Sequence, residues 1–409
     1  MTENGLSREA HVQDQRPEAE TVPPSVVQRF DESIAGTLRR AVRLSLRSPR
    51  LALFALRAAR SQRRMREIRA AHHDRGLHVP PFMILSVTNR CNLKCAGCYA
   101  RASAAAEADR GGRPPAATEA GEAADRSGAS ARREMTAEQV GSVIGQAHDL
   151  GVGVVLVAGG EPLLRPELLS IGAEFPDMIF LLFTNGLLVT DSIVRRFRSS
   201  PNVVPVISIE GHAEPTDGRR GQGTFAAALR AMALLTRAGV FFGTSITLTT
   251  ENYLEVTGRS FVESIRRSGC RHFIYVEYVP VEQGSERLAL DEAARVLTAG
   301  RIETLRRSVR ALFTAFPGGE EEFGGCLAAG RGFIHVSATG AVEPCPFAPF
   351  SDSSLCDMTL EEGLRSPLLR AIREADGALR DTTGGCALFA HRDWVTALAR
   401  DRAERAPLP

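Results

Sequence analysis

Three closely spaced cysteines are the residues of this chain whose types and spacing point most directly to chemistry. Cys91, Cys95 and Cys98 follow one another as C-x3-C-x2-C within eight residues, directly after the apolar run 82–87, which is typical of a strand. Three thiolates crowded together suit a soft metal centre. A cubic [4Fe–4S] cluster normally takes four cysteines, so three local ones leave one iron without a protein ligand. An open iron, where a small molecule can bind and react, indicates a catalytic centre.

This spacing resembles the cluster motif of the radical S-adenosylmethionine (radical SAM) enzymes. The resemblance implies that SAM chelates the open iron and that an electron from the cluster cleaves it to methionine and a 5′-deoxyadenosyl radical. It also implies an electron donor such as flavodoxin or ferredoxin. The family often has an aromatic residue just before the third cysteine, where this chain has Gly97, so Tyr99 is expected to pack near the adenine. A zinc site and a buried trio of cysteines are the alternative interpretations.

Polar residues at the ends of the next strands extend the resemblance. Two glycines and a glutamate after the predicted strand 152–158 resemble the family's Gly-Gly-Glu motif, which implies a grip on the amino group of SAM. Glycines let the backbone approach a ligand closely. Ser208 and Glu210 lie two apart in the strand 203–209, so they face the same side and suit the ribose hydroxyls. The residues expected to bind SAM are therefore Tyr99, Gly159, Gly160, Glu161, Asn185, Ser208 and Glu210.

Further polar positions have roles that the sequence leaves open. Arg219 and Arg220, in the loop before a predicted helix, would either meet a carboxylate of SAM or substrate or lie in solvent. For the neighbours Thr244 and Ser245, alternation alone does not decide which one faces the barrel interior. Glu277 is an acid in an otherwise apolar strand, which fits either substrate binding or a salt bridge.

A second set of cysteines lies in the C-terminal part of the chain. Cys326 precedes and Cys345 follows a hairpin predicted over 333–342, and Cys386 comes after two glycines. This pattern resembles the extension called SPASM, or its shorter twitch relative, which holds auxiliary iron–sulfur clusters. The resemblance implies one auxiliary cluster on these three cysteines, with Cys356 as fourth ligand or with an iron left open to substrate. Unpaired structural cysteines are the alternative.

The elements that must position these residues alternate regularly. Strands are expected over 82–88, 152–158, 179–184, 203–209, 241–249 and 272–279, and helices over 136–149, 165–174, 190–199, 223–238 and 254–268. This alternation predicts a parallel sheet with right-handed crossovers. Six such units curve into a partial (β/α)6 TIM-type barrel, the α/β fold that the resemblance also implies, and ligands belong at the carboxyl ends of its strands. A long helix is expected near 290–315.

Composition and pattern divide the 409 residues into four segments. Residues 1–30 predict a disordered tail, residues 31–76 a basic amphipathic helical region, residues 77–285 the barrel, and residues 286–409 a helical linker with the auxiliary cluster domain. Within the barrel segment, the stretch 102–131 is rich in alanine, glutamate and glycine and predicts a flexible insertion.

The N-terminal helical region concentrates positive charge in a chain whose net charge is only +2. Between residues 36 and 75, twelve arginines stand against Glu67 and Asp74. Arginines interleaved with leucines fit a helix on an anionic membrane surface, a helix packed across the barrel, or a docking face for an acidic partner. A nucleic-acid partner is not expected, because Phe54 is the single Phe, Tyr or Trp interleaved with these arginines.

The eight cysteines accompany no secretory signal and no long apolar stretch, so we expect reduced thiols in a cytoplasmic protein, peripheral at the inner membrane face if residues 31–75 bind lipid. The expected function is that of a radical SAM enzyme that abstracts hydrogen from an unidentified substrate. Peptide maturation and lipid modification are alternatives within the family. Residues 1–80 lack the strand pair of a peptide-recognition module, which weighs against a peptide. A non-catalytic iron–sulfur electron carrier or redox sensor is the alternative from another class.

Overall fold

The structure is a computed structural model that describes residues 32–37, 39–41, 49–103, 133–316, 324–380 and 386–405. The predicted tail 1–30 lies outside these residues, as does the predicted insertion from residue 104 onward. Within the described ranges, no helix is long and apolar enough to cross a membrane.

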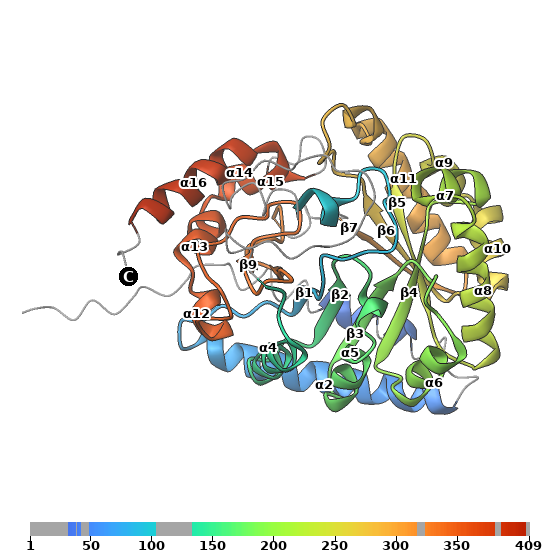
Figure 1. Ribbon diagram of the computed structural model, residues 1–409, viewed down its shortest axis with the longest axis horizontal. Helices are drawn as coiled ribbons and strands as arrows, with labels where there is room; N and C mark the ends of the chain where they lie inside the picture. The colour runs from blue at the N-terminus through green and yellow to red at the C-terminus, as the bar shows by residue number, and fades with distance from the viewer. Residues whose placement is uncertain are drawn as a thin grey trace, which may run out of the picture.

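A single curled sheet organises the molecule (Figure 1). Its six predicted strands are β1 (Phe82–Ser86), β2 (Val154–Ala158), β3 (Ile179–Thr184), β4 (Val203–Ile209), β5 (Gly243–Leu248) and β6 (His272–Glu277). They lie side by side in chain order and pair in parallel. The predicted partial TIM-type barrel is therefore confirmed.

Three further strands extend this sheet at both edges. They are β7 (Leu312–Phe316), β8 (Phe333–Val336) and β9 (Val342–Glu343). The strand β7 pairs in parallel with β6, and β8 pairs in parallel with β1. The prediction of one helix over 290–315 is wrong, because α11 (Glu292–Ser308) ends early and the chain turns extended at Val309. The expected hairpin exists as β8 and β9, but its first strand also completes the barrel sheet.

Helices cover the outside of the sheet. After the strands come α4 (Ala137–Asp149), α5 (Leu168–Glu174), α6 (Asp191–Ser199), α7 (Ala213–Arg220), α8 (Thr224–Arg237), α9 (Tyr253–Val256) and α10 (Arg259–Arg267). The C-terminal part adds α12 (Leu360–Leu364), α13 (Pro367–Glu374), α14 (Asp376–Arg380), α15 (Ala387–Ala390) and α16 (Arg392–Arg405), which gather beside β9 in Figure 1. The predicted helix 254–268 is divided into α9 and α10 at Gly258.

Apolar residues on both faces of β1 show how the barrel is filled. Met83 and Leu85 belong to the main core under the helices, whereas Phe82 faces the interior of the barrel. The ring of Phe82 stacks on Phe333 of β8 with centroids 5.1 Å apart and lies 6.2 Å from Phe316 of β7. Aromatic side chains from three strands therefore pack together inside the barrel, where all three line its cavity.

The arginine-rich region forms α2 (Pro49–His73), which runs beneath α4, α5 and α6 in Figure 1. Gln62 donates through Nε2 to the carbonyl oxygen of Gly153 at 2.9 Å, and Arg69 donates through Nη1 to that of Gly151 at 2.5 Å. Both glycines immediately precede β2, so α2 packs across the amino ends of the strands. Of the three interpretations of this region, packing across the barrel is the one that these contacts support.

Candidate active site

The C-x3-C-x2-C motif lies in the loop that follows β1, at the carboxyl ends of the strands. Cys91, Cys95 and Cys98 all line a cavity of about 290 Å³ at this end of the barrel. Cys91 is exposed, and the other two are half-buried. The loop thus presents three soft ligands to a space that also receives the ends of the other strands. Their assignment as iron ligands stays a prediction.

Hydrogen bonds hold the stem of this loop against the segment before α4. The hydroxyl of Thr88 lies 3.0 Å from both carboxylate oxygens of Glu134, and the backbone N–H of Asn89 donates to Glu134 at 2.7 Å. Arg165 donates through Nη1 to the carbonyl oxygen of Val87 at 2.8 Å. Glu134 and Arg165 were not foreseen, because neither belongs to a local pattern and each acts on a segment far away in the chain.

Three cysteines of the second set line the same cavity. Cys326, Cys345 and Cys386 reach it from segments on either side of β8 and β9 and from the start of α15. More than 200 residues separate them from the first set in the sequence. The pairing of β8 with β1 explains the meeting, because it joins the C-terminal part to the strand that precedes the cysteine loop.

The fourth cysteine of that set, Cys356, is not among the residues that line the cavity. It is exposed, and its sulfur lies 3.6 Å from the carbonyl oxygen of Thr339 and 3.9 Å from Nε2 of Gln139 on α4. Its loop turns away from the cavity toward the outer face of α4. The prediction of Cys356 as a fourth ligand therefore has no support from this geometry.

The arrangement of donor atoms distinguishes two kinds of metal centre. In the described part of the chain, no three His, Cys, Asp or Glu side chains converge as the ligands of one metal ion do. A mononuclear zinc site needs such convergence. The ligands of an iron–sulfur cluster bind different iron atoms, so their sulfurs need only surround a common space. The six cavity cysteines surround such a space, and this donor set fits iron–sulfur clusters.

The two glycines of the Gly-Gly-Glu motif pack against the cysteine loop itself. A β-carbon on Gly159, whose φ is +110°, would lie 2.5 Å from the carbonyl oxygen of Thr88, and one on Gly160 would lie 1.9 Å from that of Arg90. The N–H of Gly160 donates to the carbonyl oxygen of Thr88 at 2.7 Å. Glycine was expected here so that a ligand could approach, and the structure adds a second reason, the close approach of the loop backbone.

Glu161, the third residue of the motif, joins the ends of β2 and β3. Its carboxylate accepts hydrogen bonds from the Thr184 hydroxyl at 2.7 Å, from the Asn185 N–H at 2.8 Å and from the Leu163 N–H at 3.0 Å. Burial raises the pKa of this carboxyl, and the three hydrogen bonds oppose that rise. Glu161 also lines the cavity, so it is placed both to brace the strand ends and to contact a ligand.

Asn185 reaches from the end of β3 to the cysteine loop. Its Nδ2 donates to Oδ1 of Asn92 at 2.7 Å, and its own Oδ1 accepts from the Leu187 N–H at 3.0 Å. Asn92 follows Cys91 directly, so Asn185 is placed to hold a predicted iron ligand in position. Asn185 also lines the cavity. Asn92 was not foreseen, although its place inside the motif was a signal that could have identified it.

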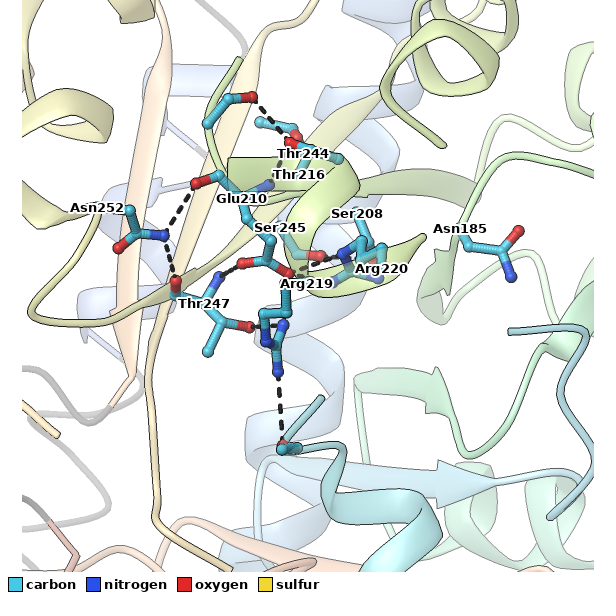
Figure 2. A network of polar contacts seen from close by, with 12 residues as sticks. Asn185, Ser208, Glu210, Thr216, Arg219, Arg220, Thr244, Ser245, Thr247 and Asn252 are labelled. Carbon is cyan, nitrogen blue, oxygen red and sulfur yellow. Dashed lines mark hydrogen bonds and ion pairs between the residues drawn. The ribbon is translucent and has the colours of Figure 1, made fainter. Parts of the chain in front are cut away.

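Glu210 is the buried centre of a polar network at the end of β4 (Figure 2). Its Oε1 lies 2.5 Å from Nη1 of Arg219 and 2.6 Å from Nη2 of Arg220, and its Oε2 accepts from the Thr247 N–H at 3.0 Å. Glu210 is not among the cavity-lining residues, whereas both arginines are. The expectation that Glu210 binds ribose stays a prediction: its carboxylate binds the guanidinium groups of Arg219 and Arg220 and is placed to position them.

Ser208 and Ser245 form a pair on the cavity wall. Their hydroxyl oxygens lie 2.9 Å apart, and both side chains line the cavity. Thr244 instead donates to the carbonyl oxygen of Ile207 at 2.7 Å and is fully buried. Ser245 is thus the inward residue of β5, and the predicted ribose contact Ser208 has a neighbour able to share hydrogen bonds with a ligand.

Tyr99 lies on the cavity wall between the two cysteine sets. Its ring packs edge-on against Phe347, with centroids 5.4 Å apart, two residues after Cys345. Burial raises the pKa of the Tyr99 phenol, and a hydrogen bond with the backbone of Gly159 opposes the rise. Tyr99 therefore links the cysteine loop to the C-terminal part, and its predicted contact with adenine stays a prediction.

Charges around the cavity include an ion pair and an arginine near the thiols. Glu277 lines the cavity and binds Nε of Arg295 at 2.8 Å, while burial raises the pKa of its carboxyl. Of the two roles foreseen for Glu277, the salt bridge is present, and substrate binding stays a prediction. Burial raises the pKa of Cys91 and of Cys95, and the positive charge of Arg220 opposes this rise at Cys95. Arg220 is therefore placed to favour a thiolate.

The comparisons with known proteins agree with this site. Residues 85–257, from β1 through α9, match the radical SAM superfamily. The chain therefore carries a radical SAM domain over these residues, and it is an enzyme with that domain.

Two curated relatives align over most of the chain. The AdoMet-dependent heme synthase of Methanosarcina barkeri is 24% identical over 358 residues, which cover 80% of this chain and 93% of that protein. The mycofactocin maturase MftC of Mycobacterium tuberculosis is 26% identical over 357 residues, 78% of each chain.

Solved structures show the same fold. SuiB of Streptococcus suis bound to S-adenosylmethionine superposes with a TM-score of 0.57 at 17% identity, covering 79% of this chain and 73% of that chain. SuiB bound to its precursor peptide SuiA superposes with a TM-score of 0.56 at 18% identity, covering 76% of this chain and 70% of that chain.

Proposed function

We propose that the chain cleaves SAM reductively at a [4Fe–4S] cluster held by Cys91, Cys95 and Cys98, and uses the product to abstract hydrogen from a substrate in the same cavity. One observation carries the proposal: two cysteine sets from opposite parts of the chain surround one cavity, which the Gly-Gly-Glu motif also lines. When bound, the cluster and SAM supply an electron and a 5′-deoxyadenosyl radical. Flavodoxin or ferredoxin is the proposed electron donor.

The chain's own residues supply positioning and exclusion of water. Glu161 and Asn185 fix the ends of β2 and β3 against the cysteine loop. Arg219 and Arg220 hold positive charge beside the cavity, where it suits the carboxylate of an amino acid. Apolar side chains such as Phe183 and Leu156 form much of the remaining wall and keep water away from a reactive species.

We place an auxiliary iron–sulfur cluster on Cys326, Cys345 and Cys386. Three cysteines leave one iron open, and the shared cavity supports a role in binding substrate or in taking an electron from it. We therefore divide the chain into the N-terminal helical region, the barrel and a C-terminal cysteine-containing part, with the sheet running on from the barrel into the last of these.

We propose a peptide as the substrate. Support comes from SuiB, which has been solved with a precursor peptide, and from MftC, which is a maturase. A tetrapyrrole is the second candidate, and a specific observation favours it: the sequence alignment covers 93% of the heme synthase but only 78% of the maturase MftC. The described N-terminal residues are also a helix across the barrel, with no strand pair for peptide recognition among them.

Two experiments test these proposals. The paramagnetic resonance spectrum of the anaerobically reconstituted, reduced protein should change when SAM is added, because SAM would bind the open iron. An unchanged spectrum would favour the electron carrier. For the substrate, the absorbance spectrum of Fe-coproporphyrin III should stay unchanged when the protein is added, if the substrate is a peptide. Short peptides encoded beside the gene should then gain or lose mass when they are co-expressed with the protein. A porphyrin absorbance shift that saturates at one equivalent would support the tetrapyrrole instead.

A further inference from the structure

Gly97, between the second and third cysteines of the motif, has its side-chain space filled by another residue. A β-carbon on Gly97 would lie 2.4 Å from the hydroxyl oxygen of Tyr278 and 2.6 Å from the Cε2 atom of its ring. The φ of Gly97 is +63°, a backbone conformation that residues other than glycine rarely adopt. Residue 97 must therefore be glycine here, and the aromatic ring beside it comes from Tyr278.

Tyr278 follows the end of β6 and is fixed in this position by the backbone. Its N–H donates to the carbonyl oxygen of Leu248, at the end of β5, at 2.9 Å. The residue is only 4% exposed, and it lines the cavity together with Gly97 and Cys98. The ring is thus a rigid part of the cavity wall next to the cysteine loop, in the space that a side chain at position 97 would otherwise take.

A second contact ties the same two segments together. The N–H of Gly97 donates to Oε2 of Glu282 at 3.0 Å, and Oε1 of Glu282 binds Nη2 of Arg101 at 2.6 Å. Glu282 lies four residues after Tyr278, so the segment that follows β6 contacts the cysteine loop at two points. The position of the ring over Gly97 therefore follows from a connected set of contacts between these segments.

The hydroxyl of Tyr278 does not explain why the ring is there. It is buried and has no hydrogen-bond partner among the described residues. The hydroxyl of Tyr275, three residues earlier in β6, is also buried but donates to the carbonyl oxygen of Val256 at 2.8 Å. A buried hydroxyl without a partner does not stabilise the fold. The aromatic ring, rather than the hydroxyl, is accordingly the part of Tyr278 to which we assign a role in the cavity.

We propose that the ring of Tyr278 is the aromatic surface against which the adenine base of SAM packs, in place of the side chain that Gly97 lacks. The inference rests on the proposed function, since it assumes that SAM occupies the cavity beside the cysteine loop. Bases stack on aromatic rings because both present flat π-faces, and an aliphatic side chain of similar volume does not reproduce this. The proposal therefore requires an aromatic side chain at position 278 for full SAM affinity.

The test measures SAM affinity without turnover. SAM is titrated into the reconstituted holoenzyme without reductant, so that it binds but is not cleaved, and binding is followed by isothermal titration calorimetry. Tyr278→Leu should weaken SAM binding by about 5- to 150-fold, the range for loss of one base–aromatic stack. Tyr278→Phe should bind SAM within about threefold of wild type, since only a hydroxyl without a partner is removed. Tyr253→Leu, on α9 and outside the cavity lining, is the matched control and should leave the affinity unchanged.

A base-free probe separates stacking from general damage. Methionine carries the amino-acid end of SAM without the adenine, so its affinity should be the same in wild type and Tyr278→Leu. Equal weakening of methionine and SAM would overturn the proposal, as would a SAM affinity of Tyr278→Leu equal to wild type, or of Tyr278→Phe as low as Tyr278→Leu. Each of these outcomes leaves the proposed function standing. Wild-type protein that failed to respond to SAM would overturn both.

Discussion

The space above Gly160 is occupied by the carbonyl oxygen of Arg90, which would lie 1.9 Å from a β-carbon at residue 160. The next N–H, that of Glu161, donates to the same oxygen at 2.9 Å. Arg90 immediately precedes Cys91. The turn after β2 and the start of the cysteine loop are thus packed backbone to backbone, and the shape of the loop depends on the absence of a side chain at residue 160.

Gly160→Ala should therefore lose the barrel cluster. The new methyl group forces the Arg90 carbonyl away and displaces Cys91, while the auxiliary cysteines stay in place. Iron analysis after reconstitution should give about four irons per chain instead of about eight. Gly300→Ala on α11 is the control, because a β-carbon added at Gly300 would meet no atom within 4 Å, and it should keep the iron content of wild type. Full iron loading of Gly160→Ala would show that the loop tolerates the displacement.

Removing the charge of Glu210 should destabilise the fold strongly. Its side chain is 2% exposed and pairs with both Arg219 and Arg220, whose side chains are 18% and 13% exposed. Glu210→Gln leaves both buried cations without the carboxylate that they contact directly, which costs about 3–5 kcal/mol of unfolding free energy. Glu251→Gln breaks an exposed pair with Arg287 and should cost less than about 1 kcal/mol. Urea unfolding measures both, and equal losses would contradict the role assigned to Glu210.

Two buried histidines predict a fall in stability at mildly acidic pH. Burial lowers the pKa of His272 and of His78 to about 4, from the ordinary value of 6.5, with the charge of Arg373 contributing at His78. As the pH falls below 6.5 the unfolded chain binds protons that the folded chain refuses until about pH 4. The unfolding free energy should thus drop by about 2 kcal/mol per histidine between pH 7 and pH 5.

His272→Gln should reduce that pH dependence. The variant removes one of the two titrating groups, so its unfolding midpoint should change less between pH 7 and pH 5 than that of wild type. Other acid effects are common to both proteins and cancel in the comparison. An identical pH dependence in wild type and variant would contradict the low pKa of His272.

Two cysteines of the C-terminal part should behave differently. Cys345→Ala should lose the auxiliary cluster, so iron falls to about four atoms per chain while SAM cleavage remains. Cys356→Ala should keep the full iron content, since Cys356 is exposed and lies outside the cavity lining. Loss of iron from Cys356→Ala would show that Cys356 is a ligand. An unchanged iron content in Cys345→Ala would contradict the proposed auxiliary cluster.

The sequence predicted what depends on short-range pattern. The six central strands begin and end within a few residues of the predicted positions, because runs such as 203–209 are apolar and bounded by turn residues. The positions of Gly160 and Glu161 also followed from their place directly after a strand. Strand β7 was missed because 312–316 continues an apolar pattern that fits a helix equally well.

Long-range partners could not be predicted from local pattern. Nothing in the segment 333–336 indicates that it pairs in parallel with β1, and only that pairing brings Cys345 to the first cysteine set. The ion pairs of Glu210 were not foreseen for the same reason, because the two arginines that its carboxylate binds belong to a separate helix. Tyr278 was not singled out from the sequence, because its proposed role depends on the contact of its ring with Gly97, 181 residues earlier in the chain.

The production of 5′-deoxyadenosine tests the central claim most directly. Anaerobically reconstituted wild-type protein, given dithionite and SAM, should release 5′-deoxyadenosine, measured by liquid chromatography. A variant in which Cys91, Cys95 and Cys98 are all replaced by alanine should release none, although it keeps the auxiliary cysteines. Production of 5′-deoxyadenosine by that variant at the wild-type rate would contradict the account, because the three thiolates would then not hold the cluster that cleaves SAM.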